Sequence, residues 1–166
     1  MSNREFNPDE PLAYLLTWTT YGTWLPGDDR GWNRKDVAAN QPPDSLFRAA
    51  AESRMTESAF TLSESHREIV ERTIHRHCEI RNWQLHAISV RSNHVHVVVT
   101  ARGYKPETVR DQFKAWCTRK LKQAGESREN FWTEGCSQRW INCDDDLESA
   151  VVYVLEAQDR KGREAQ

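Results

Sequence analysis

Hydrophobic and polar positions repeat with two different periods along this chain, and these periods predict its helices and strands. Apolar residues recur every three to four positions over about 64–81 and over about 106–123, which predicts two long amphipathic helices. A period of two, typical of strands, runs through 84–90 and 94–100. The short polar turn Arg91-Ser92-Asn93 between these two strands predicts a β-hairpin. If Ser92 and Asn93 form the turn, Arg91 pairs with His94 and Ser89 pairs with His96.

Three more elements complete the pattern. Residues 12–24 are rich in β-branched and aromatic side chains and predict a first strand, which Pro26-Gly27 ends. Residues 131–141 predict a bent or glycine-interrupted strand. Three aspartates at 144–146 predict the start of a last helix, about 145–160, because acidic side chains stabilise a helix N-terminus.

Residues 28–60 fit neither period. This polar stretch contains Pro42-Pro43 and one short helix candidate, about 45–54, that Asp44 would cap. We predict an insertion or long functional loop within a single domain that spans 1–166.

Two patterns after this stretch fit a capping box at the start of the first long helix. They are Thr61-Leu62-Ser63-Glu64 and Ser65-His66-Arg67-Glu68.

The predicted order is strand, insertion, helix, strand, strand, helix, strand and helix. Such an order predicts an α+β fold of the ferredoxin-like type, with a split βαβ antiparallel sheet and two helices packed on one of its faces. The other face and the C-terminal helix, which carries a tyrosine, are then available for a functional site.

Length and composition agree with one packed domain, because 166 residues with 37% hydrophobic and 29% charged side chains suffice for a single core. No apolar run reaches the length of a membrane span, and the first eleven residues lack a secretory signal. We therefore expect a cytoplasmic protein without membrane contact. The four cysteines have no C-x-x-C spacing and indicate no zinc site.

The net charge of −2 is unevenly distributed. Residues 101–128 carry eight basic and three acidic side chains, which is compatible with a DNA-binding helix or, alternatively, with a solvated helix face. The candidate phosphate contacts are Lys114, Arg119, Lys120 and Lys122. The candidate base-stacking residues are Tyr21, Trp24 and Trp32. Trp32 follows Gly31 and is the best exposed candidate, although a place in the core is the alternative for each aromatic residue.

The sharpest chemical feature is His94-Val95-His96. Side chains alternate across a strand, so both imidazoles project from one face while the valines project from the other. Two such imidazoles can hold one divalent ion if a further ligand completes the shell. The alternative is a half-exposed polar face without a metal.

A second feature is Tyr153 in the last helix. With 100° per residue, Tyr153 lies off the apolar stripe formed by residues such as Ala150 and Val154, so its own helix does not bury the hydroxyl. A phenol is a poor nucleophile near neutral pH, and a nucleophilic role requires a nearby cation and a polarised electrophile. The alternative is a tyrosine that packs at the edge of the core.

Together, Asn93-His94-Val95-His96, the basic helix, the segment Trp132–Ile141 and the helical Tyr153 resemble the single-tyrosine HUH transposases, which include the REP-associated tyrosine transposases. The resemblance implies a divalent metal, Mg²⁺ or Mn²⁺, held by His94 and His96. It also implies that Tyr153 attacks a phosphodiester of single-stranded or hairpin DNA, and that the protein is a homodimer.

One position departs from the family pattern. Members place a Gln or Asn four residues after the tyrosine as the third metal ligand, and here that residue is Ala157. Glu156, about 60° from Tyr153 on an α-helix, is favoured by geometry, whereas Gln158 is favoured by the type of side chain. Both remain candidates for the third ligand.

Three functions follow from these features. The first is a strand-transfer enzyme that cleaves and rejoins single-stranded DNA through a 5′-phosphotyrosine. The second is a domesticated or inactive relative that binds DNA hairpins without cutting them, for which Ala157 is the sequence hint. The third is a metal-binding protein with chemistry unrelated to nucleic acids.

Overall fold

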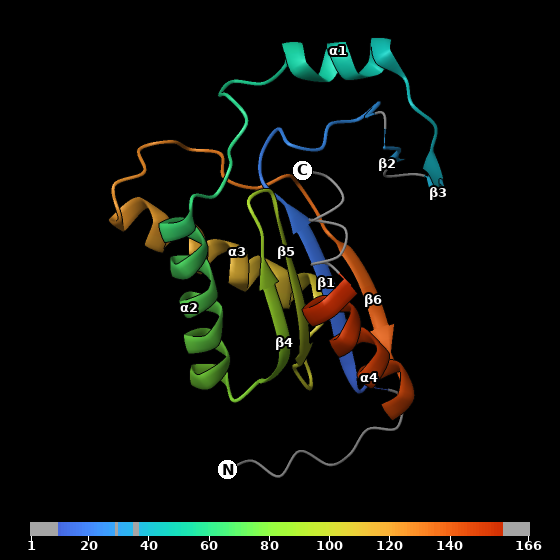
Figure 1. Ribbon diagram of the computed structural model, residues 1–166, viewed down its shortest axis with the longest axis vertical. Coiled ribbons are helices and arrows are strands. Elements are labelled where there is room, and N and C mark those ends of the chain that lie inside the picture. The colour runs from blue at the N-terminus through green and yellow to red at the C-terminus, as the bar shows by residue number, and fades with distance from the viewer. Residues whose placement is uncertain (1–9, 29, 35–36, 158–166) are drawn as a thin grey trace.

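The computed structural model describes residues 10–28, 30–34 and 37–157, and its centre is a four-stranded antiparallel sheet (Figure 1). The strand order is β4-β5-β1-β6. These strands are β1 (Ala13–Thr19), β4 (Gln84–Val90), β5 (His94–Thr100) and β6 (Ser137–Ile141). The helices around this sheet are α2 (Glu64–Arg81), α3 (Pro106–Gln123), α4 (Asp144–Val152) and a π-helical continuation of α4, η1 (Tyr153–Ala157). The predicted α+β fold class is confirmed.

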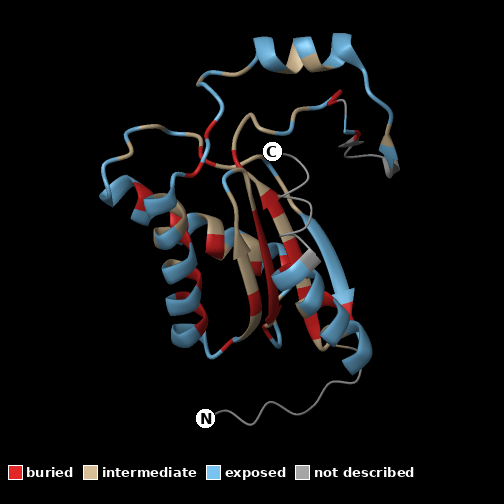
Figure 2. Ribbon diagram, in the orientation of Figure 1, coloured by how far each residue is buried: buried red, intermediate tan, exposed pale blue. Residues whose placement is uncertain are grey.

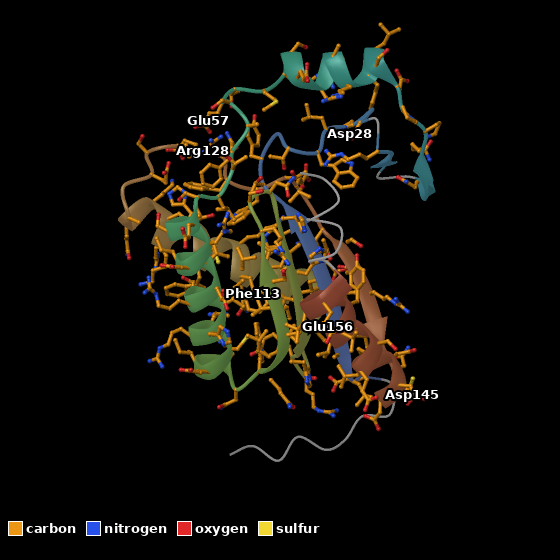
Figure 3. All side chains as sticks on the ribbon, in the orientation of Figure 1. Asp28, Glu57, Phe113, Arg128, Asp145 and Glu156 are labelled. Atoms are coloured by element: carbon orange, nitrogen blue, oxygen red, sulfur yellow. The ribbon has the colours of Figure 1, made fainter. Side chains whose placement is uncertain are left out.

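The two faces of the sheet carry different layers. Helices α2 and α3 lie against one face, where Val95, Val97 and Val99 of β5 join the main core (Figure 2). Phe113 of α3 is completely buried in this core and stacks on Trp18 of β1, 6.2 Å between ring centroids (Figure 3). Helix α4 and η1 pack on the opposite face, so the last helix covers the face that the histidines occupy.

The hairpin follows the predicted register. Ser89 pairs with His96, and the amide of Arg91 donates a 2.8 Å hydrogen bond to the carbonyl of His94. Ala87 is buried on the face of α4, whereas Ile88 packs against the valine core. The alternation of side chains along β4 and β5 therefore separates the main core from the face that carries His94 and His96, where Ala87 and Val98 form a smaller core with α4 and η1.

The start of α2 differs from both capping boxes expected from the sequence. Ser63 is the N-cap, and its hydroxyl accepts a hydrogen bond from the amide of His66, while the His66 ring accepts one from the Ser63 amide. The reciprocal pair is thus made by serine and histidine instead of by Thr61 or Ser65 with glutamate. An imidazole replaces the carboxylate because its Nδ1 also reaches back to the N-cap amide.

The segment between β1 and α2 stands over the end of the sheet where β1 finishes and β5 begins (Figure 1). It contains a two-stranded sheet, β2 (Trp32–Arg34) with β3 (Val37–Gln41), and a helix, α1 (Ser45–Ser53). Asp44 caps α1 by accepting a hydrogen bond from the amide of Phe47, which confirms the predicted short helix. None of the α1 residues is buried (Figure 2). The assignment of 28–60 as an insertion in one domain stays a prediction.

Two strands are shorter than predicted. β1 ends at Thr19, because the hydroxyl and amide of Thr23 both donate to the carbonyl of Thr20 and close a turn there. β6 begins only at Ser137, after Gly135 with a φ of +81°. This glycine allows the left-handed backbone that interrupts the predicted strand.

Every helix in the described ranges is too short or too polar to span a membrane.

Candidate functional site

The paired histidines lie at the start of β5 on the face covered by α4 and η1. Their ring centroids are 4.8 Å apart with the ring planes nearly perpendicular. His96 is 5% exposed, and His94 at the end of the strand is half-buried. The two imidazoles thus share one small region, as the alternation of the sequence predicts.

The Nδ1 atom of each histidine makes a hydrogen bond to a side-chain oxygen. Nδ1 of His94 donates to the side-chain carbonyl of Asn93 at 2.6 Å, which leaves the ring lone pair on Nε2. Nδ1 of His96 shares a 2.7 Å hydrogen bond with the hydroxyl of Thr17, which is its cross-strand partner on β1. Such contacts orient imidazoles for metal binding through Nε2.

Sequence reasoning missed Thr17. The residue belongs to the polar positions that alternate with Leu16 and Trp18 along β1, so its face of the strand could have been predicted. Its pairing with His96 could not, because 79 residues separate the two and the register between β1 and β5 is a long-range property.

Tyr153 lies beside this pair. Its ring centroid is 5.9 Å from that of His96, with an interplanar angle of 86°, and its side chain is 37% exposed. The neighbouring Val154 is fully buried in the small core that contains Val98 of β5. Because Val98 and His96 are two residues apart on the same face of the strand, the packing of Val154 sets Tyr153 next to His96.

The helix changes its winding at the tyrosine. Residues Tyr153–Ala157 form a π-helical turn, which is closed by i→i+5 hydrogen bonds and advances by about 80° per residue instead of about 100°. Glu156 then lies about 120° from Tyr153 instead of about 60°, and its side chain is exposed. The α-helical spacing that favoured Glu156 as the third ligand is therefore not present, while Gln158 lies outside the described residues.

The residues of this region fit a divalent cation in part. His94 and His96 are the neutral nitrogen donors that Mn²⁺ and related ions accept, and both rings are held by oxygen partners. Within the described ranges, no group of three or more His, Cys, Asp or Glu side chains comes together. The choice of third ligand stays open between Glu156 and Gln158.

The outer side of α4 is acidic. Tyr153 also borders a shallow depression, which is lined by Asp145, Glu148, Ser149, Val152 and Tyr153 itself. Asp145 lies near the far end of α4 from η1 (Figure 3). Carboxylates repel anions, so this side is unfavourable for an anionic ligand.

The basic residues of α3 lie away from the histidines, because α3 covers the opposite face of the sheet. The ammonium of Lys114 donates to the carbonyls of Thr133 at 2.8 Å and Gly135 at 2.6 Å, and burial lowers its pKa to about 8. Arg119, Lys120 and Lys122 are exposed. The structure thus gives Lys114 a role in holding the chain before β6, and the three exposed residues stay predicted phosphate contacts.

The loop after β1 is joined to the histidine strand. The amide of Thr20 donates to the carbonyl of Asn93 at 2.9 Å, and the hydroxyl of Thr23 donates to the same carbonyl at 3.5 Å. Trp24 follows directly, and the Arg30 guanidinium lies over its ring. The side chain of Trp32, the base-stacking candidate of the sequence, lies outside the described part of the structure.

Two solved structures share this fold at 13% sequence identity. A REP-associated tyrosine transposase bound to a REP hairpin superposes with a TM-score of 0.56, covering 98% of this chain and 75% of that one. A protein from Deinococcus radiodurans R1 described as a transposase superposes with a TM-score of 0.51, covering 100% of this chain and 97% of that one. No curated protein matches the chain in sequence.

The match to a family model extends over residues 54–152, more than half of the chain, and that family is described as IS200-like transposase. The matched range includes the paired histidines, the basic helix α3 and all of α4. It ends at Val152, one residue before Tyr153. This chain therefore belongs to the IS200-like transposase family.

Proposed function

We propose that this protein cleaves and rejoins single-stranded DNA in a metal-dependent reaction in which Tyr153 becomes bonded to a 5′ phosphate. One observation carries the proposal: the exposed Tyr153 ring lies 5.9 Å from His96, whose ring is 4.8 Å from that of His94. A nucleophile and two metal-binding imidazoles in one place are the parts that phosphodiester transfer needs.

The hydroxyl oxygen of Tyr153 attacks phosphorus and loses its proton to solvent. The bond from phosphorus to the 3′ oxygen breaks, and that oxygen takes up a proton and leaves as a 3′-hydroxyl. A divalent cation held by His94 and His96 would stabilise the negative charge that develops on the phosphate. Rejoining reverses these steps with a 3′-hydroxyl as the nucleophile, and the phosphotyrosine conserves the bond energy, so no ATP is required.

We infer that the DNA strand enters from the end of the sheet where β5 begins. His94 is at this end, the loop after β1 is bonded to Asn93 beside it, and the carboxylates of α4 flank the other approach. A strand must be unpaired for its phosphate to reach a tyrosine between a helix and a sheet. A hairpin with an unpaired tail is therefore the proposed substrate, in agreement with the hairpin bound to the structurally similar transposase.

Replacement of Tyr153 by phenylalanine tests the nucleophile. Tyr153→Phe keeps the ring and its packing on His96, so we expect hairpin binding within about two-fold of wild type but no covalent product. The measurement is an SDS-stable adduct between the protein and a labelled hairpin in the presence of Mn²⁺. An adduct that still forms with Tyr153→Phe would remove Tyr153 from the mechanism.

A second candidate function is hairpin binding without cleavage. It is favoured by Ala157 at the position of the expected third ligand. The same assay separates the two candidates, because a protein that only binds gives a saturable hairpin complex and no adduct at any Mn²⁺ concentration.

The homodimer that the family resemblance predicts is part of the proposal. Within the described sheet β6 is an edge strand, and four of its five residues are exposed, so it is available for contact with a second copy. Light scattering coupled to size-exclusion chromatography measures the mass in solution. A mass of one chain at all concentrations would contradict the dimer.

A further inference from the structure

Trp24 and Arg30 form a stacked pair in the loop after β1. The Arg30 guanidinium carbon lies 4.0 Å from the centroid of the Trp24 ring, and the indole Nε1 donates a 2.7 Å hydrogen bond to the carbonyl of Gly31. The indole is 38% exposed despite these contacts. A large aromatic surface is thus held in one orientation at the surface of the protein.

Asp28 fixes the guanidinium in this position. Its two carboxylate oxygens accept hydrogen bonds from Nε and an NH2 nitrogen of Arg30, both at 2.8 Å, and the NH2 nitrogen also donates to the carbonyl of Thr23. Asp28 is 4% exposed and belongs to the segment between β1 and α2 (Figure 3). The charge of Arg30 is therefore balanced within the loop, which favours a stacking role over phosphate binding.

The loop is rigidly attached next to the histidines. Thr20 and Thr23 both donate to the carbonyl of Asn93, whose side chain in turn accepts from His94. The amide of Tyr21 donates a hydrogen bond to the carbonyl of Phe131, and the carbonyl of Tyr21 accepts one from the amide of Phe60, each at 2.8 Å. Two short hydrogen bonds thus link Trp24 to His94: the Thr23 hydroxyl donates to the carbonyl of Thr20 at 2.7 Å, and the amide of Thr20 donates to the carbonyl of Asn93 at 2.9 Å.

We propose that the Trp24–Arg30 pair is a stacking site for one unpaired base of the DNA strand whose phosphate lies at His94, His96 and Tyr153. The proposal rests on the proposed function in taking single-stranded DNA as the ligand. Planar indole and guanidinium groups stack on any nucleobase, because every base has a π-face. The stacked base would orient the chain of the nucleic acid at the point where it enters the site.

The protein contains a matched control for this pair. Trp116 and Arg119 on α3 form a similar contact, 4.8 Å from the guanidinium carbon to the ring centroid, and Trp116 is 39% exposed. Both pairs therefore combine an indole of the same exposure with an arginine. The Trp116 pair belongs to the helix on the opposite face of the sheet from the histidines, so it should not contact the same base.

The experiment measures equilibrium binding of a labelled DNA hairpin with unpaired tails on both sides, in EDTA so that no cleavage occurs. Trp24→Ala is compared with Trp24→Phe and with Trp116→Ala. We expect Trp24→Ala to weaken binding by about 5- to 160-fold, the range for loss of one base–aromatic stack. Trp24→Phe keeps a stacking ring and should bind within a few-fold of wild type. Trp116→Ala keeps the charge of Arg119, a predicted phosphate contact, and should also bind within a few-fold of wild type.

A series of hairpins with one abasic site at each tail position in turn identifies the base. At the stacked position the abasic site and Trp24→Ala should not be additive, because each removes the same contact. The salt dependence of binding should also be unchanged in Trp24→Ala, since no phosphate contact is lost. A comparable loss by Trp24→Ala on every abasic hairpin would show an indirect effect of the loop and overturn the proposal.

The result is independent of cleavage. Wild-type binding strength for Trp24→Ala, together with a normal covalent adduct, would overturn the stacking site and leave the strand-transfer function intact. A protein that forms no adduct but shows the non-additive loss would retain the stacking site and lose the strand-transfer function. Equal losses for Trp24→Ala and Trp116→Ala would also contradict the proposal, because neither location would then be specific.

Discussion

Thr17→Val is the sharpest perturbation of the proposed metal site that leaves both histidines in place. Valine has nearly the shape of threonine and a high β-propensity, so β1 should keep its pairing with β5. The change removes the 2.7 Å hydrogen bond between the Thr17 hydroxyl and Nδ1 of His96. Nothing else in the immediate surroundings of His96 is altered.

Two separate effects follow from this loss. His96 is 5% exposed, so Nδ1 loses a partner where water has little access, and we expect the free energy of unfolding to fall by about 1 to 3 kcal/mol. The imidazole is also less well oriented, and loss of such a contact typically lowers metal affinity by about 10- to 100-fold. The second effect corresponds to about 1.4 to 2.7 kcal/mol of binding free energy.

Mn²⁺ titration followed by electron paramagnetic resonance measures the affinity without DNA or catalysis. Thr100→Val is the control, because the Thr100 hydroxyl accepts a hydrogen bond of the same length, 2.7 Å, from Nε2 of His86 in the same sheet, while it donates one to the carbonyl of Leu12 at 2.6 Å. Thr100 is at the other end of β5, away from His94. Both variants should lose stability, and only Thr17→Val should lose Mn²⁺ affinity.

The reasoning would be refuted by Mn²⁺ affinity that is the same in Thr17→Val and wild type. It would equally be refuted by a loss of the same size in Thr100→Val, because a general effect of stability would then explain both. Thr17→Ser restores the hydroxyl and is expected to recover most of the affinity, which separates orientation of His96 from simple packing.

Two other predictions concern groups with shifted pKa values. Burial lowers the pKa of Lys114 to about 8 from 10.5. The unfolded state therefore binds more protons between these two pH values, and the free energy of unfolding should rise with pH there. In urea unfolding, the difference in free energy of unfolding between wild type and Lys114→Met should change across this pH range. The hydrogen bonds from Arg30 lower the pKa of Asp28 to about 2 from 3.8, so its contribution is complete above pH 3.8 and is lost as the pH falls towards 2. Asp28→Asn should therefore cost about 1 to 2 kcal/mol near neutral pH, less than the full shift implies because Arg30 is partly solvated, and the urea midpoints of wild type and variant should converge in acid.

The elements with strong periodicity were predictable because local burial decides them. Helices α2 and α3 have the predicted bounds, and the β4–β5 hairpin has the predicted register. In that hairpin a one-residue shift would exchange the valines of β5 for His94 and His96 in the core, so the register is strongly determined. The same alternation brought the two histidines together, which made half of the candidate site readable from the sequence.

The other half depends on contacts between distant segments. Thr17 reaches His96 through strand pairing, and Asp28 and Arg30 are brought towards His94 by bonds from Thr20 and Thr23 to Asn93. No local periodicity encodes these contacts. The sequence prediction also assumed α-helical geometry, about 100° per residue, for Tyr153–Ala157. The π turn found there removes the geometric preference for Glu156.

The division of β5 between two faces bears directly on whether this chain cuts DNA or only binds it. Val95, Val97 and Val99 belong to the main core, whereas His94 and His96 project to the opposite face and Tyr153 is 37% exposed beside them. The main core therefore excludes the side chains that would perform the chemistry. A family member could lose a metal ligand, as Ala157 suggests, without losing its fold or its loop next to Asn93. The covalent adduct at Tyr153 is therefore the measurement that distinguishes the active enzyme from a hairpin-binding relative.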